Sequence, residues 1–295
     1  GFGFTDAQGW RLSMMVVGGV IFVTGIAYYF LTQDAPDGNF SELREKGLMP
    51  DKKNVTGDYF RAMADYRVWV LFLIYGASFG IELTVNNVAA LYFYDDFDLS
   101  LVAAGGVAAS FGLMNVFART LGGIFGDNFG ALWGLKGRSF WLFVVLLGEG
   151  VALMIFSQMS VLFLALPMLI IFSLFTQMAE GATYSVVPFI NKKSLGAVAG
   201  IVGAGGNAGA VAAGFLFKGA MDWNDVFFVI GVTVALASVL PFLIRFSPEQ
   251  EEEEKAAFEK AQFDVLHLRA ERANEALRAS VEIVEEYQRK NKAKA

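Results

Sequence analysis

Seven long apolar runs dominate this sequence and decide what it can fold into. A membrane-spanning helix needs about 20 mostly apolar residues, with a range of about 17–25. Barrel strands are shorter and alternate between polar and apolar side chains, and these runs do not. The sequence therefore predicts an all-α membrane protein, in which the fourth run is the shortest. The runs cover residues 12–31, 68–93, 102–125, 140–156, 162–187, 195–217 and 226–244.

Composition supports the membrane class and excludes several others. Hydrophobic residues make up 55% of the chain and charged residues 18%, whereas soluble domains average about 45–50% and about 25%. There is no cysteine, and the one histidine, His267, lies in the polar tail. This excludes a disulfide scaffold, a cysteine-ligated metal site and a cysteine nucleophile. No nucleophile–base pair or metal cluster is visible, so we expect no enzyme activity, metal or cofactor.

The distribution of Lys and Arg between the runs predicts an orientation. Basic residues gather after the first, third and fifth runs and in the tail, and Lys218 is the one exception to this alternation. Cytoplasmic loops carry the excess of Lys and Arg, so these segments are expected to be cytoplasmic. The chain opens Gly-Phe-Gly-Phe without Met or a signal pattern, so we expect a fragment that lacks its N-terminal part. We predict four parts: a first span in 1–31, a central cytoplasmic loop at 32–67, a six-helix bundle at 68–245 and a charged, helical cytoplasmic tail at 246–295.

The tail allows two interpretations. Its mixed charges and thin apolar seam fit a solvated helix, but the seam also fits a helix that docks on another cytoplasmic element or on a second copy. The same mixed charges argue against nucleic acid as a partner. The seam consists of Phe263, Leu266, Ala270, Ala273, Leu277, Ser280, Val284 and Tyr287.

Four ionisable residues fall within the predicted spans, where such groups usually mark function. They are Glu82, Arg119, Glu149 and Glu180. In the second span, Glu82 shares one helical face with Tyr75 and Phe79. This stripe indicates either a polar path or a tight contact between helices.

Arg119 lies one turn after Asn115 in the third span, far from either end. A guanidinium at that depth either pairs permanently with one of the three glutamates or receives an anionic substrate. The sixth span, residues 195–217, is rich in Gly and Ala, which lets helix backbones approach closely. Between the third and fourth runs, Asp127 and Arg138 are typical of a charge-paired cytoplasmic loop.

Together these residues resemble the C-terminal half of a major facilitator superfamily transporter. More closely, they resemble the nitrate/nitrite porter family, in particular its eukaryotic high-affinity nitrate transporters. Gly-Ala-Gly-Gly-Asn at 203–207 looks like the second nitrate signature of that family. Residues 122–138 resemble the conserved cytoplasmic loop motif of the superfamily, interrupted by an insertion. The other segments that carry the resemblance are 80–95, 109–119 and 181–189.

The resemblance implies that the seven runs are the last seven of twelve helices, and that nitrate or nitrite binds between the two halves. It implies a cytoplasmic gate made of Gly123, Asp127, Gly137 and Arg138. It also implies a multi-pass protein of the plasma membrane and leaves room for an accessory membrane subunit. The substrate-binding residues expected from this chain are Arg119, Tyr75, Phe79, Asn115, Gly203, Gly206 and Asn207.

Uptake of an anion against a negative-inside potential costs about 2.3 kcal/mol per charge per 100 mV, so uphill import needs coupled cations. The resemblance implies protons as those cations and alternating access as the mechanism. Glu82 is the first candidate for the protonation site because it shares a stripe with Tyr75 and Phe79, and Glu180 and Glu149 are the others. In the alternative interpretation, Glu82 is structural and coupling lies elsewhere.

Two other function classes stay open. A facilitator for another small anion would use Arg119 equally well. A seven-helix receptor or nutrient sensor fits the number of spans, but no span carries the mid-helix lysine that a retinal protein needs.

Overall fold

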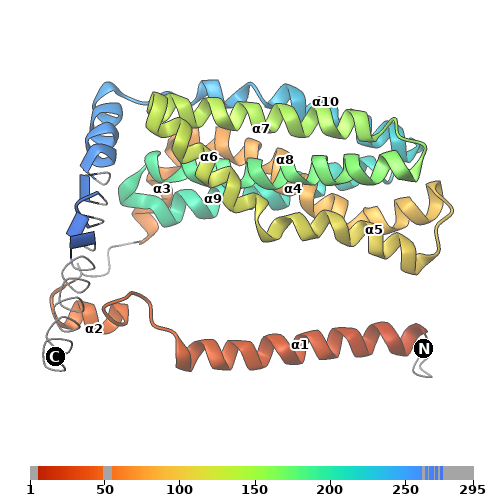
Figure 1. The fold of residues 1–295 in the computed structure, drawn as a ribbon, viewed down its shortest axis with the longest axis horizontal. Coiled ribbons are helices and arrows are strands. Elements are labelled where there is room, and N and C mark those ends of the chain that lie inside the picture. The colour runs from red at the N-terminus through yellow and green to blue at the C-terminus, as the bar shows by residue number, and fades with distance from the viewer. Residues whose placement is uncertain are drawn as a thin grey trace, which may run out of the picture. The chain divides into compact units, whose positions relative to one another are not determined.

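The computed structural model describes residues 6–48 and 55–260, and in the tail also residues 263–264, 266–268, 270–271 and 273–274. The chain divides into two compact units, Gly1–Val55 and Thr56–Ala295. The described residues are almost entirely helical, as Figure 1 shows. They include seven helical segments long and apolar enough to cross a membrane, which confirms the predicted all-α membrane class.

The first unit holds one candidate span and one short helix. α1 (Asp6–Leu31) carries no charged residue after Arg11. α2 (Phe40–Glu45) begins where the Phe40 N–H donates to Asp34 Oδ2 at 3.0 Å. The segment predicted as a central loop therefore contains helix α2 and, at its end, helix α3 (Val55–Ala64).

The second unit is a bundle of long helices that run alongside one another (Figure 1). α4 packs against α5 and α9, α8 packs against α6 and α7, and α10 packs against α7. A tail helix begins at residue 248 and is described continuously to residue 260. The elements between α3 and the tail are α4 (Tyr66–Asp96), α5 (Leu101–Leu113), the 3-10 turn η1 (Met114–Val116), α6 (Ala118–Trp133), α7 (Leu135–Phe156), α8 (Leu162–Val186), the 3-10 turns η2 (Val187–Phe189) and η3 (Lys192–Ser194), α9 (Leu195–Leu216), α10 (Trp223–Ala237) and the 3-10 turn η4 (Leu240–Leu243).

Helix α4 begins at a charged cap. The Asp65 carboxylate accepts the Arg67 N–H at 2.9 Å and pairs with the Arg67 guanidinium at 2.7 Å. Burial raises the pKa of Asp65, but the hydrogen bonds and positive charge of Arg67 outweigh burial, so the pKa is lowered from its ordinary value. Asp65 therefore stays ionised at neutral pH and fixes where α4 starts.

The third span, predicted over 102–125, is interrupted in the structure. It consists of α5, η1 and α6, and Phe117 between η1 and α6 has a φ of −134°. No proline lies in this segment, so the sequence gives no helix-breaking signal. On either side of Phe117, Asn115 and Arg119 both bond to Glu82 of α4. The prediction of a third span is confirmed, and its interruption at Phe117 is a feature that the sequence did not predict.

The connection between the third and fourth spans also differs from the prediction. We expected a loop that contains Asp127 and Arg138, but α6 continues to Trp133 and α7 begins at Leu135. The connection is Gly134 alone, at φ +66°, a backbone conformation that glycine adopts without strain. The glycines that suggested a loop serve close packing instead, since a Cβ at Gly137 would collide with the carbonyl oxygen of Phe129. As a result the fourth span has 22 residues and is no shorter than α9.

The contact between α4 and α9 depends on backbones that touch. A Cβ at Gly209 would collide with the carbonyl oxygen of Gly76, and one at Gly205 would collide with that of Phe72. Backbone atoms cannot move aside as the end of a flexible side chain can. The Gly and Ala content of the sixth span is therefore explained by close helix packing, as predicted.

We predict that Gly209→Ala lowers the midpoint of thermal unfolding of the detergent-purified protein, because overpacking a close contact costs about 1–3 kcal/mol. Gly214→Ala is the matched control on the same helix, where no atom lies within 4 Å of the added Cβ. The control should leave the midpoint unchanged or raise it, since Ala in a helix is favoured over Gly by about 0.5–1 kcal/mol. Equal midpoints for the two variants would contradict the close-contact interpretation.

Candidate functional site

The charged centre of the bundle is Arg119, in the first turn of α6 directly after the break at Phe117. Its Nη2 donates to Glu82 Oε2 at 2.9 Å and to Gln177 Oε1 at 3.3 Å. The same guanidinium contacts the carboxylate of Glu180 from α8. The Arg119 side chain is 38% exposed, whereas those of Glu82 and Glu180 are 5% and 0% exposed. The guanidinium is thus held from inside by buried acids and keeps one accessible side.

The two carboxyl groups are held differently. Glu82 has a partner for each oxygen, because Asn115 Nδ2 donates to Oε1 at 3.0 Å and Arg119 donates to Oε2. Glu180 lies beside Glu82, yet neither of its oxygens has a well-formed hydrogen bond. Two carboxylates against one guanidinium leave an excess negative charge, which is costly to bury. One proton on either carboxyl group would remove that excess.

An aromatic wall lies beside the guanidinium. Arg119 Cζ is 5.8 Å from the centre of the Phe79 ring, within the range of a cation–π contact. Phe79 stacks on Tyr75 at 5.1 Å between ring centres, and Tyr184 of α8 meets Tyr75 edge-on at 5.2 Å. The predicted stripe on α4 therefore meets Arg119 with the Phe79 ring and the Glu82 carboxylate, and Tyr75 supports the Phe79 ring.

Two glycines of α9 lie beside these rings, and Gly206 leaves room for one of them. A Cβ at Gly206 would collide with the Phe79 ring, and one at Gly203 would lie 3.5 Å from the Tyr184 hydroxyl. Asn207 is exposed, and within the described part of the chain no hydrogen bond joins it to Arg119. The structure thus brings Gly203 and Gly206 to the aromatic wall, whereas Asn207 lies outside the cluster.

The sequence profile of the Major Facilitator Superfamily matches residues 1–189. The chain belongs to the major facilitator superfamily.

Several nitrate transporters are similar to this superfamily member. High affinity nitrate transporter 2.5 of Arabidopsis thaliana is 37% identical over 248 residues, which are 84% of this chain and 49% of that protein. High-affinity nitrate transporter 2.3 of Oryza sativa subsp. japonica is 36% identical over 84% of this chain and 48% of its own length. Nitrate transporter 2.2 of Chlamydomonas reinhardtii is 36% identical over 83% of this chain and 49% of its length. The chain therefore spans about half the length of these relatives.

Residues 122–138, in which we expected a cytoplasmic loop motif, lie in α6 and α7 apart from Gly134. The Asp127 carboxylate of α6 contacts the buried Arg138 guanidinium of α7, which also donates to the Ser185 carbonyl at 3.3 Å. Arg138 Cζ lies 4.7 Å from the centre of the Phe189 ring. Gly123 faces the Gly181 carbonyl of α8. Asp127 and Arg138 thus join α6, α7 and the end of α8.

Glu149 stands apart from the charged centre. It lies on α7, is fully buried, and both carboxyl oxygens lack a well-formed hydrogen bond, although Thr176 of α8 is adjacent. Among the described residues no ion pair joins it to Arg119. Glu149 is therefore separate from the two glutamates on the guanidinium.

Sequence reasoning left two residues out of the site. Gln177 accepts a hydrogen bond from Arg119, and Tyr184 packs against Tyr75. Both are three or four residues from Glu180 on α8, so they share its helical face. That spacing is the signal that could have found them.

We predict that Arg119→Gln lowers the stability of the bundle, because it leaves Glu82 and Glu180 buried without a positive charge. Adding Glu180→Gln should restore part of the loss, with a coupling energy of about 0.5–3 kcal/mol. The midpoints of thermal unfolding of the single and double variants measure this. Arg61→Gln is the control, because its pair with Asp58 is 3.7 Å long and Arg61 is 72% exposed, so little change is expected. Strictly additive effects of the two changes would show that Arg119 and Glu180 are not coupled.

Proposed function

We propose that this chain is part of a nitrate transporter in which Arg119 receives the anion. The observation that carries the proposal is the accessible guanidinium between buried carboxyl groups and an aromatic wall. Nitrate is flat and carries one charge, so a planar fork of N–H donors matches its in-plane oxygens. The rings of Phe79 and Tyr75 suit its faces. Similarity to proteins named nitrate transporters supports this substrate.

The geometry also supports proton symport. A bound anion would add a third negative group to a guanidinium that already faces two carboxylates. Protonation of one carboxyl group removes that conflict, so anion and proton favour each other's binding. The sequence favoured Glu82 as the protonation site. We propose that Glu180 takes the proton and that Glu82 positions Arg119, because Asn115 holds Glu82 by a hydrogen bond that Glu180 lacks.

Transport would follow alternating access, in which one half of a transporter rocks against the other around the site. We place Gly203 and Gly206, but not the exposed Asn207, at that site, and the contact between Asp127 and Arg138 at a gate. The basic connections and the tail are proposed to be cytoplasmic, in the plasma membrane. The aromatic wall and guanidinium would accept nitrite or another small planar anion as well.

We predict that Arg119→Lys abolishes most nitrate uptake by the complete protein while membrane expression is retained, because Lys keeps the charge but loses the planar fork. Losing one charge-assisted hydrogen bond is worth about 1.5–3 kcal/mol, or roughly 10- to 100-fold in affinity. Uptake is measured in a strain that lacks its own nitrate transporter. The matched control is Arg61→Lys, an exposed arginine outside the site. Undiminished uptake by Arg119→Lys would rule out the binding role.

We predict that Glu180→Gln removes most of the stimulation of uptake by external acid, because glutamine has nearly the same shape but cannot take up a proton. Glu82→Gln and Glu149→Gln are measured beside it over the same range of external pH. Loss of acid stimulation in Glu82→Gln or Glu149→Gln but not in Glu180→Gln would reassign the protonation site. Unchanged stimulation in all three would place coupling outside these glutamates.

A further inference from the structure

A second site lies far from Arg119, at the end of the bundle that carries the tail. It is a cavity of about 790 Å³ between the end of α6, the start of α7 and the segment that follows η4. Along α6, the distance from Arg119 to Trp133 is roughly 20 Å at 1.5 Å per residue. The cavity is therefore separate from the proposed substrate site and lies where the membrane span ends.

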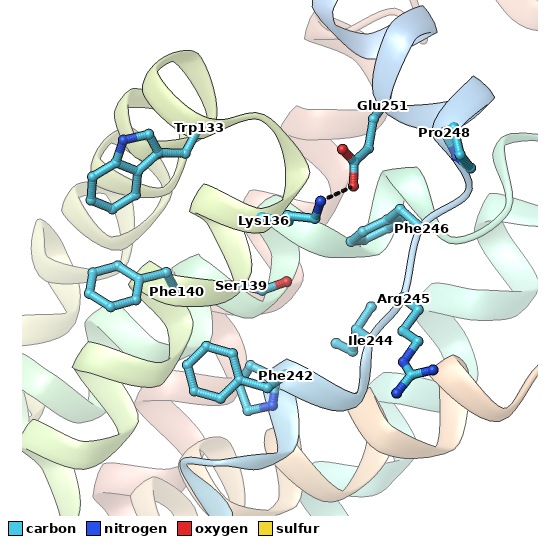
Figure 2. Close-up of a pocket in the computed structure, with 11 residues that line it drawn as sticks. Trp133, Lys136, Ser139, Phe140, Phe242, Ile244, Arg245, Phe246, Pro248 and Glu251 are labelled. Carbon is cyan, nitrogen blue, oxygen red and sulfur yellow. Dashed lines mark ion pairs between the residues drawn. The ribbon is translucent and has the colours of Figure 1, made fainter.

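The cavity has an apolar part and a polar part. Figure 2 shows Trp133, Phe140 and Phe242 on one side and Phe246 on the other. Trp133 is 59% exposed and Phe242 is 52% exposed. Large aromatic side chains at the end of a membrane span are typical of the boundary between hydrocarbon and headgroups.

The polar side chains that line the cavity are not matched by one another. The Ser139 side chain is 5% exposed, and its Oγ has no hydrogen-bond partner in the structure. Lys136 Nζ pairs with Glu251 Oε1 of the tail helix at 3.3 Å, but Lys136 is 78% exposed, so this pair is weak. Arg245 also lines the cavity, and within the described residues its guanidinium makes no ion pair. The cavity thus has a buried hydroxyl without a hydrogen bond, and two positive side chains for one carboxylate. This combination points to an anionic ligand.

We propose that this cavity binds an anionic phospholipid of the leaflet at the tail end of the bundle. Lys136 and the Ser139 hydroxyl would hold the phosphate, and an acyl chain would lie along Trp133 and Phe242. Arg245, whose guanidinium points away from Lys136 in Figure 2, would add positive charge at the edge of the cavity. Phosphatidylcholine has no net charge, because its choline cation offsets its phosphate, so Lys136 and Arg245 would attract it less than an anionic lipid. The leaflet is the cytoplasmic one in the orientation proposed above, where anionic lipids are concentrated. The site does not depend on what the bundle transports.

The test uses the complete protein in phosphatidylcholine vesicles that contain a trace of phosphatidylserine with a photoreactive acyl chain. Mass spectrometry of the labelled peptides should find the label around Trp133–Phe140 and around Phe242–Phe246, and much less with a photoreactive phosphatidylcholine. Lys136→Gln and Arg245→Gln should each reduce this labelling about fivefold, which corresponds to about 1 kcal/mol per basic residue near an anionic surface. Lys192→Gln is the matched control, because it removes an exposed lysine at the same end of the bundle, outside the residues that line the cavity.

Glu251→Gln separates lipid binding from anchoring of the tail. It breaks the same ion pair as Lys136→Gln but leaves Lys136 free, so labelling should stay or increase. Loss of labelling in Glu251→Gln would overturn the proposal, as would equal labelling by the two lipids. Displacement of the label by excess inorganic phosphate would identify a free-anion site instead. Crosslinks from this cavity to residues 275–295 or to a second copy would show that protein, and not lipid, occupies it.

Discussion

A guanidinium cannot remain inside a membrane bundle unless its neighbours neutralise it, and the arrangement around Arg119 follows from that constraint. Glu82 comes from α4 and Glu180 from α8, so one side chain of α6 ties three helices together. The break at Phe117 places Asn115 and Arg119 on the same carboxyl group. Because the two carboxyl groups outnumber the one guanidinium, the charges of the cluster do not balance. The proposed binding of an anion and a proton rests on this imbalance.

The sequence specified the membrane class well because hydropathy acts over about 20 residues and needs no tertiary information. The helix boundaries were harder to predict where glycine was involved. Glycine serves both turns and close packing, and residues 122–138 contain both uses. Gly134 makes the turn, whereas Gly137 lets α7 pack on the carbonyl of Phe129. Only the packing partner distinguishes these roles, and the partner is not visible in a local sequence pattern.

The candidate site, like the helix boundaries, could be predicted only in part. The spacing of Tyr75, Phe79 and Glu82 on α4 was enough to predict one face, and the structure turns that face toward Arg119. The sequence left open whether Arg119 pairs with a glutamate or receives an anion. The structure shows two pairs and an accessible side together, so the alternatives are not exclusive. Which glutamates take part depends on how α4, α6 and α8 pack, and that could not be read from helical periodicity alone.

The one-residue connection at Gly134 has a mechanical consequence. α6 begins beside the anion position proposed here and ends at this joint, after 16 residues or roughly 24 Å. If a helix of that length tilts by roughly 10° about one end, its other end moves by roughly 4 Å. Asp127 lies on α6, and Arg138 lies on α7, four residues after Gly134. With no loop to absorb the movement, a tilt of α6 at Arg119 would pass directly to the contact between α6 and α7.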